Sequence, residues 1–227
     1  MRTVQRKPRE KTEHATDQPD GKDWRVFCAI EITDQVGDRL GNHIETLQRL
    51  SPGASASWGR AGKFHLTLKF LGNISRNRIA DLSSAAQRAT DAIEPFKIYV
   101  GRTGIFPKHG PPRVLWIGVE DSTGTLSRLQ RRLEEECSTV GFEAEEREFR
   151  PHLTIARLRK PEGAKALARS HLALAFPPVE ALIKELHVYR SELGREGSKY
   201  TVISSHPFAS HPFASDGGFE GETEIRA

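Results

Sequence analysis

Two stretches of alternating apolar and polar residues stand out along the chain, because both begin with the same tripeptide, His-Leu-Thr. The first covers residues 64–72 and the second covers residues 151–158. Alternation with a period of two predicts half-buried strands, in which side chains at i and i+2 leave the same face of a sheet. Each stretch therefore presents one imidazole beside one hydroxyl. The two copies are 87 residues apart (152 − 65), which suits two halves of one domain that each contribute one pair.

The remaining elements follow from the same kind of pattern. Apolar runs and alternation predict strands at 25–32, 96–101, 114–119, 179–190 and 200–203. Apolar residues at helical spacing predict helices at 34–50, 77–92, 121–140 with its capping residues, and 164–171. Turn-forming residues predict loops at 54–62 and 104–112. Because strands and helices alternate about twice over, we expect an α+β architecture of two sheet-containing lobes, one from each half of the chain.

Composition separates a globular middle from two polar ends. Residues 1–23 carry basic side chains without a periodic apolar face, and residues 205–227 contain a repeated Ser-His-Pro-Phe-Ala unit followed by a Gly/Glu-rich run. Such segments bury too little apolar surface to offset the entropy of ordering. We therefore predict disordered tails on either side of a domain at 24–204. Loose RNA contact by the basic tail and a short interaction motif in the repeat remain alternatives.

Charge and cysteine content narrow the class of protein. The chain has 227 residues and a formal net charge of +4, a mild basicity that is compatible with an anionic ligand. Its two cysteines, Cys28 and Cys137, cannot build a disulfide framework or a Cys-based zinc site. The sequence has no apolar stretch of membrane-spanning length and no hydrophobic segment after its basic N-terminus. We expect a cytoplasmic protein without membrane association, and nothing in the sequence requires more than a monomer.

The repeated residue pairs indicate acid–base chemistry on a phosphate. Histidine titrates near neutrality, so His65 and His152 in one cleft can act as an acid and a base. The hydroxyls of Thr67 and Thr154 can donate hydrogen bonds to phosphate oxygens. Two opposed histidines without a nucleophilic side chain suit in-line phosphodiester cleavage. Arg157 would add a guanidinium that matches a phosphate, provided that the strand twists or bulges; strict alternation would make it a surface arginine.

With these motifs the chain resembles the 2H phosphoesterase superfamily, in particular the RNA 2',3'-cyclic phosphodiesterase family, also called 2'-5' RNA ligases. That superfamily is defined by two His-x-Thr/Ser-x motifs, here at 65–68 and 152–155. Flanking segments that also match the family pattern are 25–30, 70–72, 115–118, 150–154 with Arg157, and 186–193. The resemblance covers about residues 24–204. Cys28 stands where the family often has a larger apolar residue, a difference expected to affect packing only.

The resemblance implies a bilobal 2H phosphoesterase fold with pseudo-twofold symmetry, in which two antiparallel sheets enclose a central cleft. It also implies hydrolysis of a 2',3'-cyclic phosphate to a 2'-phosphate on RNA ends or nucleotides, without a metal or other cofactor. By position, His65 and His152 would be catalytic, and Thr67, Thr154 and Arg157 would bind substrate. We assign His65 as the acid that protonates O3' and His152 as the base that activates water, although the symmetric motifs carry no label that fixes the roles.

Three other functions stay open at this point. The same site could join RNA ends through a 2'-5' linkage. The chain could bind RNA ends without chemistry, although both motifs are intact. The histidines could hold a metal ion, although the sequence lacks clustered ligand patterns such as His-x-His or His-Glu-x-x-His.

Other aromatic and histidine residues are weaker candidates for the site. Phe27 and Phe149 could stack on a base or pack in the core, and packing is the expectation. His187 lies on a predicted strand without a neighbouring threonine. His43 is expected on a polar helix face and His171 at a helix end, so neither is placed in the site.

Overall fold

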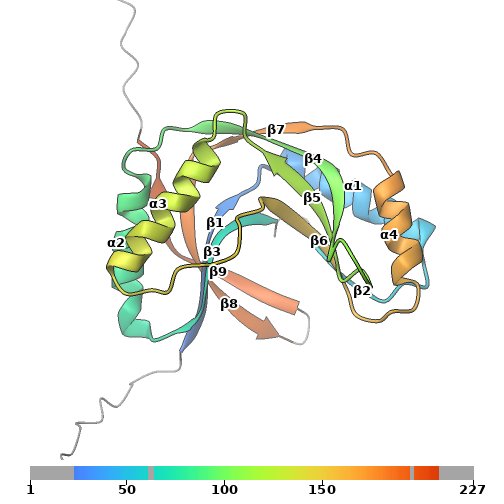
Figure 1. Ribbon diagram of the computed structural model, residues 1–227, viewed down its shortest axis with the longest axis horizontal. Helices are drawn as coiled ribbons and strands as arrows, with labels where there is room; N and C mark the ends of the chain where they lie inside the picture. The colour runs from blue at the N-terminus through green and yellow to red at the C-terminus, as the bar shows by residue number, and fades with distance from the viewer. Residues whose placement is uncertain (1–22, 61–63, 195–196, 210–227) are drawn as a thin grey trace, which may run out of the picture.

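Figure 1 shows the computed structural model, which describes residues 23–60, 64–194 and 197–209. In chain order its elements are β1 (Trp24–Glu31), α1 (Asp34–Leu50), β2 (Ala56–Trp58), β3 (His65–Ile74), a 3-10 turn (Arg76–Arg78), α2 (Ile79–Thr90), β4 (Phe96–Phe106), β5 (Val114–Glu120), α3 (Thr125–Thr139), β6 (His152–Leu158), α4 (Ala164–Ala173), β7 (Val179–Ile183), β8 (Glu185–Gly194) and β9 (Gly197–Pro207). Among the described residues, no helix is both long enough and apolar enough to cross a membrane.

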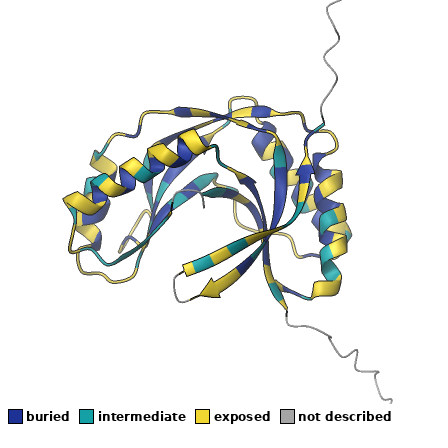
Figure 2. Cartoon of the chain, turned by 180° about the vertical axis from the view of Figure 1, so that it is seen from behind, coloured by how far each residue is buried: buried dark blue, intermediate teal, exposed yellow. Residues whose placement is uncertain are grey.

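The strands form two antiparallel sheets that face each other across the middle of the molecule. One sheet has the order β3-β1-β8-β9 and the other has the order β2-β6-β5-β4-β7. Helices α2 and α3 pack on the first sheet, and α1 and α4 pack on the second. Figure 1 shows these helices on the outer sides of two lobes. Figure 2 shows buried residues on the sides of the helices that meet the sheets, so each lobe has its core between its helices and its sheet.

The two lobes are not the two halves of the chain. The first lobe takes β1 and β3 from the start of the chain and β8 and β9 from its end, whereas β2 and β4 to β7 form the second sheet. Helix α1 follows β1 yet packs in the second lobe, and α3 follows β5 yet packs against β3. The prediction of one lobe from each half is therefore wrong. The prediction that each lobe carries one motif strand is confirmed, because β3 and β6 lie in different sheets.

A pseudo-twofold relation is visible in the strand order. The order β3-β1-β8-β9 corresponds to β6-β5-β4-β7, with the motif strand first in each list. Strand β2 is an addition that pairs with β6 and has no counterpart in the first lobe as the structure describes it. The lobes are thus equivalent around the motifs and different at the outer side of β6.

Two predicted elements have different limits in the structure. The expected loop 54–62 contains β2, which has only three residues and is too short to show a periodic pattern. The apolar run 179–190 is divided at Lys184 into β7 and β8, which lie in different sheets. The alternation is interrupted at the same place, because Lys184 and Glu185 are two consecutive polar residues. The prediction of one continuous strand did not take this break into account.

The fold also extends past residue 204. Strand β9 reaches Pro207, and Phe208 after it is 3% exposed, with its ring stacked 5.7 Å from that of Phe96. The predicted start of the tail at 205 is therefore wrong for residues 205–209, because the first Ser-His-Pro-Phe-Ala unit fills part of the core. The second unit and the rest of that predicted tail lie outside the described residues, as do residues 1–22.

The core of the second lobe contains a hydrogen-bonded pair of histidines, His43 of α1 and His171 of α4. Nε2 of His171 lies 3.1 Å from the carbonyl oxygen of Trp116 and 3.2 Å from that of Gly104, so this nitrogen carries the proton and donates. Nδ1 of His171 therefore accepts from Nε2 of His43, 3.0 Å away. The expectation that His43 lies on a polar face is wrong: it follows Leu40 by three residues and shares its buried side.

This pair predicts a loss of stability in mild acid. Burial, together with the neighbouring His171, lowers the pKa of His43 to about 4, and burial lowers the pKa of His171 as well. Both pKa values lie below that of an unfolded histidine, about 6.5, so the stabilisation is complete above that pH and is lost as the pH falls towards 4. We expect the free energy of unfolding in urea to fall by on the order of 2 kcal/mol between pH 7 and pH 4.5.

The matched control is His43→Gln, which can still donate to His171 but cannot take up a proton there. Its unfolding free energy should depend less steeply on pH than that of the wild type. Equal slopes for the two proteins would contradict the role given to the pair.

Candidate active site

The facing sheets enclose a cleft of about 1360 Å³. All five residues predicted for the site line it: His65, Thr67, His152, Thr154 and Arg157. The first two come from β3 and the other three from β6, so one pair is contributed by each lobe. The structure therefore brings together residues that are 87 positions apart in the chain (152 − 65).

A bulge in each motif strand explains why Arg157 reaches the cleft. In β6 the register shifts after the motif threonine: Trp116 pairs with Thr154, and the preceding residue Leu115 pairs with Ala156. The extra residue, Ile155, is buried like its neighbour Ala156, and the alternation resumes one position later with Arg157 exposed. A bulge of this kind re-aims the side chains that follow it. The twist or bulge that a phosphate-binding Arg157 requires is present.

The same bulge occurs in β3 and identifies a residue that the sequence analysis did not place in the site. There Ala29 pairs with Thr67 and Cys28 pairs with Lys69, so the strand again gains one residue after the motif threonine. Phe70 thereby takes the position that Arg157 has in β6, the fifth after the histidine. It lines the cleft, and 46% of its surface is exposed. A residue-by-residue alignment of the two motif copies would have paired Phe70 with Arg157 and so indicated it as a site residue.

Arg25 of β1 lies against the ring of Phe70. Its guanidinium carbon is 4.5 Å from the ring centroid, a cation–π contact, and both residues line the cleft. At equivalent positions, the first lobe therefore has the Phe70 ring in contact with a guanidinium, and the second lobe has the guanidinium of Arg157 itself. A ring of this kind offers a stacking surface for a nucleobase.

His152 is held in one tautomer by the backbone. Its Nδ1 lies 2.6 Å from the carbonyl oxygen of Arg150, an acceptor, so Nδ1 carries the proton. The ring packs edge to face on Phe106, with centroids 5.0 Å apart, and lies 6.2 Å from Trp116. The Trp116 ring in turn covers Gly104, where an added Cβ would lie 2.0 Å from it. When the imidazole is neutral, Nε2 is left as the unprotonated nitrogen.

Burial lowers the pKa of His152 below its usual value; the Arg150 carbonyl opposes this shift, and the positive charge of Arg157 adds to it. The imidazole is therefore neutral at pH 7. A neutral imidazole with one free ring nitrogen is the form required of a general base.

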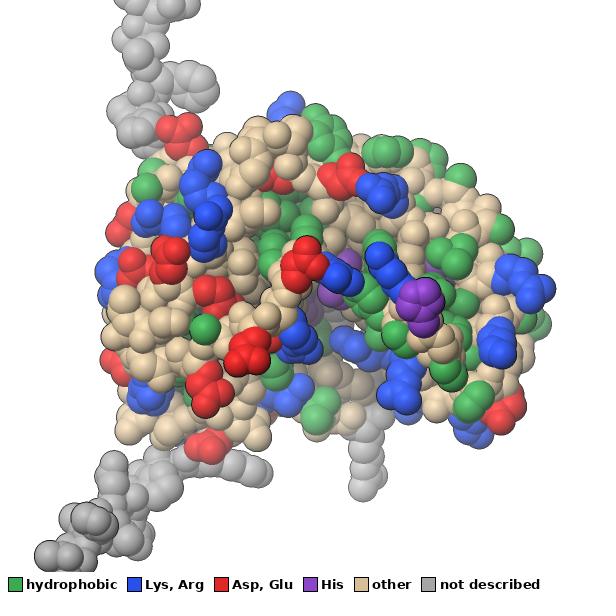
Figure 3. All heavy atoms as spheres, in the orientation of Figure 1, with side chains coloured by type: hydrophobic (Ala, Val, Ile, Leu, Met, Phe, Trp, Pro, Cys, Tyr) green, Lys and Arg blue, Asp and Glu red, His purple; other side chains and the backbone are tan. Residues whose placement is uncertain are grey.

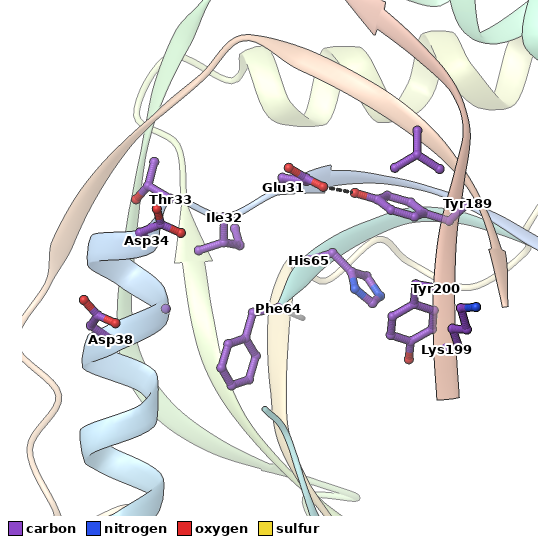
Figure 4. Close-up of a pocket in the computed structure, with 12 residues that line it drawn as sticks. Glu31, Ile32, Thr33, Asp34, Asp38, Phe64, His65, Tyr189, Lys199 and Tyr200 are labelled. Carbon is purple, nitrogen blue, oxygen red and sulfur yellow. Dashed lines mark hydrogen bonds between the residues drawn. The ribbon is translucent and has the colours of Figure 1, made fainter. Parts of the chain in front are cut away.

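His65 sits among aromatic rings on the opposite wall. The centroid of Phe27 is 4.8 Å from that of His65, and the ring of Tyr200 meets it edge to face at 4.9 Å. Behind it Tyr189 donates a hydrogen bond of 2.5 Å to Glu31. Figure 4 shows His65 between Phe64 and the two tyrosines, in a side pocket of about 350 Å³ that also adjoins the first turns of α1. Packing on several sides restricts the ring to a narrow range of orientations.

The cleft is positively charged. Its lining includes four arginines, Arg25, Arg60, Arg157 and Arg159, and no Asp or Glu among the described residues that line it. Figure 3 shows Lys and Arg side chains around the hollow between the lobes. Such a cleft attracts an anionic substrate and raises its local concentration.

The residues that could hold a metal ion do not gather here. Within the described ranges, no three His, Cys, Asp or Glu side chains lie close enough together to bind one. Cys28 and Cys137 are both buried and free.

Comparison with known proteins agrees with this geometry. A family model described as the 2'-5' RNA ligase superfamily matches residues 36–195, which is most of the chain. The chain belongs to this superfamily. An RNA 2',3'-cyclic phosphodiesterase of Thermotoga maritima is 33% identical to it over 180 residues, which is 79% of this chain and 92% of that protein. One of Methanothermobacter thermautotrophicus is 32% identical over 178 residues, covering 78% and 95%.

Solved structures share the fold of this superfamily member. The crystal structure of the protein TT0787 from Thermus thermophilus superimposes with a TM-score of 0.65 and 26% identity, over 81% of this chain and 97% of that one. The crystal structure of E. coli LigT complexed with 3'-AMP superimposes with a TM-score of 0.65 and 23% identity, over 83% of this chain and 100% of that one. The expected α+β, bilobal 2H phosphoesterase fold with two antiparallel sheets is therefore confirmed.

Of the three weaker candidates, Phe149 and His187 do not line the cleft, and Phe27 belongs to its lining but is almost entirely buried. Phe149 packs against the core. Phe27 is 3% exposed and contacts His65 from behind, so it supports the imidazole and leaves no free face for a base. His187 is buried in the first sheet, where its Nδ1 lies 2.9 Å from the hydroxyl of Ser205. The expectation that both phenylalanines pack in the interior is confirmed.

Proposed function

We propose that this protein hydrolyses the terminal 2',3'-cyclic phosphate of RNA to a 2'-phosphate by metal-independent acid–base catalysis. The observation that carries the proposal is the placement of two His-x-Thr pairs in one cationic cleft, one on each lobe. Relatives at about a third identity bear the name of this activity, which supports the same conclusion.

The roles follow from the two environments. Thr67, Thr154 and Arg157 bind the non-bridging phosphate oxygens, and the guanidinium offsets the negative charge that grows in the transition state. Neutral His152 takes a proton from water through Nε2, and the water oxygen bonds to phosphorus. As the bond from phosphorus to O3' breaks, protonated His65 gives its proton to O3'. The product is a 2'-phosphate with a free 3'-hydroxyl, and proton exchange with solvent resets both imidazoles.

The opposed walls match the geometry of this reaction. In-line displacement needs the base on the side of the attacking water and the acid on the side of the leaving oxygen. One histidine on each lobe meets that requirement with the phosphate between them. The fixed tautomer of His152 favours it as the base.

The test of the proposal is an assay of the purified protein with a 2',3'-cyclic nucleotide in the presence of EDTA. We expect turnover to a 2'-phosphate, with the regiochemistry read by phosphorus NMR. Absence of turnover by freshly folded protein would overturn the hydrolase proposal. Turnover that EDTA abolishes and metal restores would overturn the metal-independent mechanism.

Joining of RNA ends through a 2'-5' linkage is the second candidate, since a 5'-hydroxyl can replace water as the nucleophile. His152 would then take the proton of the 5'-hydroxyl as its oxygen bonds to phosphorus, and His65 would protonate the departing O3'. Incubating RNA ends with a 2',3'-cyclic phosphate and a 5'-hydroxyl partner, at equal enzyme concentration, compares joining with hydrolysis. A third possibility, RNA-end binding without chemistry, predicts retention of labelled RNA on the protein and no change in its termini.

Arg157→Ala is expected to act mainly on substrate binding. A charge-assisted hydrogen bond to phosphate contributes about 1.5–3 kcal/mol, so KM should rise about 10- to 100-fold, with a smaller change in kcat. Steady-state kinetics on a cyclic mononucleotide measure both. Arg169→Ala, which removes an exposed arginine from α4 outside the cleft, is the control. An unchanged KM for Arg157→Ala would show that this arginine does not hold the phosphate.

A further inference from the structure

Strand β2 makes the two walls of the cleft unequal. It pairs with β6 through Ala56, Ser57 and Trp58, and the described part of the first sheet has no strand in the equivalent place beside β3. Ser57 lies opposite Arg157 in this pairing, and the β2 residues line the same cleft. An element beyond the duplicated motifs therefore shapes one end of the site.

Arg159 is fixed by this added strand. Its backbone N–H donates to the carbonyl oxygen of Ser55 at 2.9 Å, which continues the pairing of the two strands. Its Nη2 donates to the hydroxyl of Ser57 at 2.8 Å. The bond to Ser57 uses one of the five guanidinium N–H groups and leaves the others for a ligand. Arg159 is thus an anchored cation in the wall of the cleft.

Arg159 and Arg157 are neighbours on one face. They are two residues apart along an extended segment, so their side chains leave the same side of it and their Cα atoms are about 7 Å apart. No carboxylate belongs to the lining of the cleft in the described part of the chain, so neither guanidinium is neutralised there by an acidic group of the lining. A 2',3'-cyclic phosphate carries one negative charge, and the two motif pairs and Arg157 are sufficient to bind it. A second guanidinium held in the same wall is therefore suited to a second phosphate group of the substrate.

We propose that Arg159 binds the phosphodiester on the 5' side of the reacting nucleotide, so that the site recognises an RNA end of at least two nucleotides rather than a mononucleotide. This inference rests on the proposed function and adds a subsite to it. Ser57 is the positioning residue, because its hydroxyl accepts a hydrogen bond from the Arg159 guanidinium and so holds it in the wall of the cleft.

Kinetics on two matched substrates test the subsite. One is a nucleoside 2',3'-cyclic phosphate, and the other is the dinucleotide that carries the same terminus and one internucleotide phosphate. For Arg159→Ala we expect KM for the dinucleotide to rise about 10-fold while KM for the mononucleotide changes less than about 2-fold, as one charged hydrogen bond is lost. Ser57→Ala should give part of the same effect, and Arg169→Ala should give none.

A methylphosphonate at the internucleotide linkage removes the charge from the substrate instead of from the protein. For the wild type, KM should be about 10-fold higher with this substrate than with the normal dinucleotide. For Arg159→Ala, KM should be the same with both substrates. The slope of log KM against log salt for the dinucleotide should decrease by about 0.7 in the variant, as expected for one fewer phosphate contact on a single strand. If the methylphosphonate raised KM equally in the wild type and in Arg159→Ala, the second phosphate would bind elsewhere and the assignment would be overturned.

Binding separates failure of this inference from failure of the proposed function. Calorimetry with a nucleoside 2'-phosphate and with the dinucleotide ending in a 2'-phosphate requires no turnover. We expect the wild type to prefer the dinucleotide and Arg159→Ala to lose that preference. Turnover of mononucleotides without any dinucleotide preference would overturn the subsite and leave the hydrolase standing. A preference for the dinucleotide without turnover of either substrate would overturn the hydrolase and leave the subsite standing.

Discussion

His152→Ala and His65→Ala should each lower kcat by about two to four orders of magnitude, the range for loss of a general acid or base. Each histidine moves a different proton in the same step, so neither can replace the other. Steady-state assays with a cyclic mononucleotide, using saturating substrate, measure the loss. His109→Ala, which removes an exposed histidine that does not line the cleft, should leave kcat within about 2-fold. A near-normal rate in either motif variant would refute the paired-histidine mechanism.

The pH profiles of the same variants assign the two roles. In the wild type, kcat/KM should rise with pH as the base loses its proton and fall again as the acid loses its own. The rising limb should lie below about pH 6.5, because burial lowers the pKa of His152. His152→Ala should lose the rising limb, and His65→Ala should lose the falling one. The opposite pattern would exchange acid and base while keeping both histidines catalytic.

Local patterns were sufficient for the parts of the site that depend on one strand at a time. The alternation around His65 and His152 predicted both motif strands, and the apolar spacing from Val36 to Leu47 predicted the helix Asp34–Leu50 with its correct limits. In these segments the residues that create the pattern are the residues that are buried.

Features that depend on a partner element could not be read in this way. The bulges after Thr67 and Thr154 arise from the register with β1 and β5, and without them strict alternation turns Phe70 and Arg157 away from the motif histidines. The crossing of α1 and α3 between lobes depends likewise on which sheet accepts each helix. Phe208 looked like part of a polar repeat because its partner, Phe96, is distant in sequence.

The bulge in β3 has a second consequence, since it places Lys69 in the interior. Lys69 takes the position of Ala156 in the other motif strand and is 3% exposed. Its Nζ forms an ion pair with Glu134 of α3 and donates to the carbonyl oxygen of Glu143 at 2.7 Å. A buried ammonium requires such partners, because transfer of an unpaired charge out of water is costly. The pair therefore joins the motif strand to the helix that covers it.

Glu134→Ala should destabilise the protein by about 3 kcal/mol, the lower end of the range for removing one partner of a buried ion pair, because the Glu134 side chain keeps 15% of its surface exposed. Urea unfolding at pH 7 measures the change. The double variant Lys69→Met, Glu134→Leu should recover most of the loss, since it removes both charges and fills the same space. A loss below about 0.5 kcal/mol, as for an ordinary surface substitution, would show that Lys69 finds another partner. Because Lys69 lies between Thr67 and Phe70, weakening this anchor should also raise KM at temperatures where the fold is intact, and the double variant should restore it.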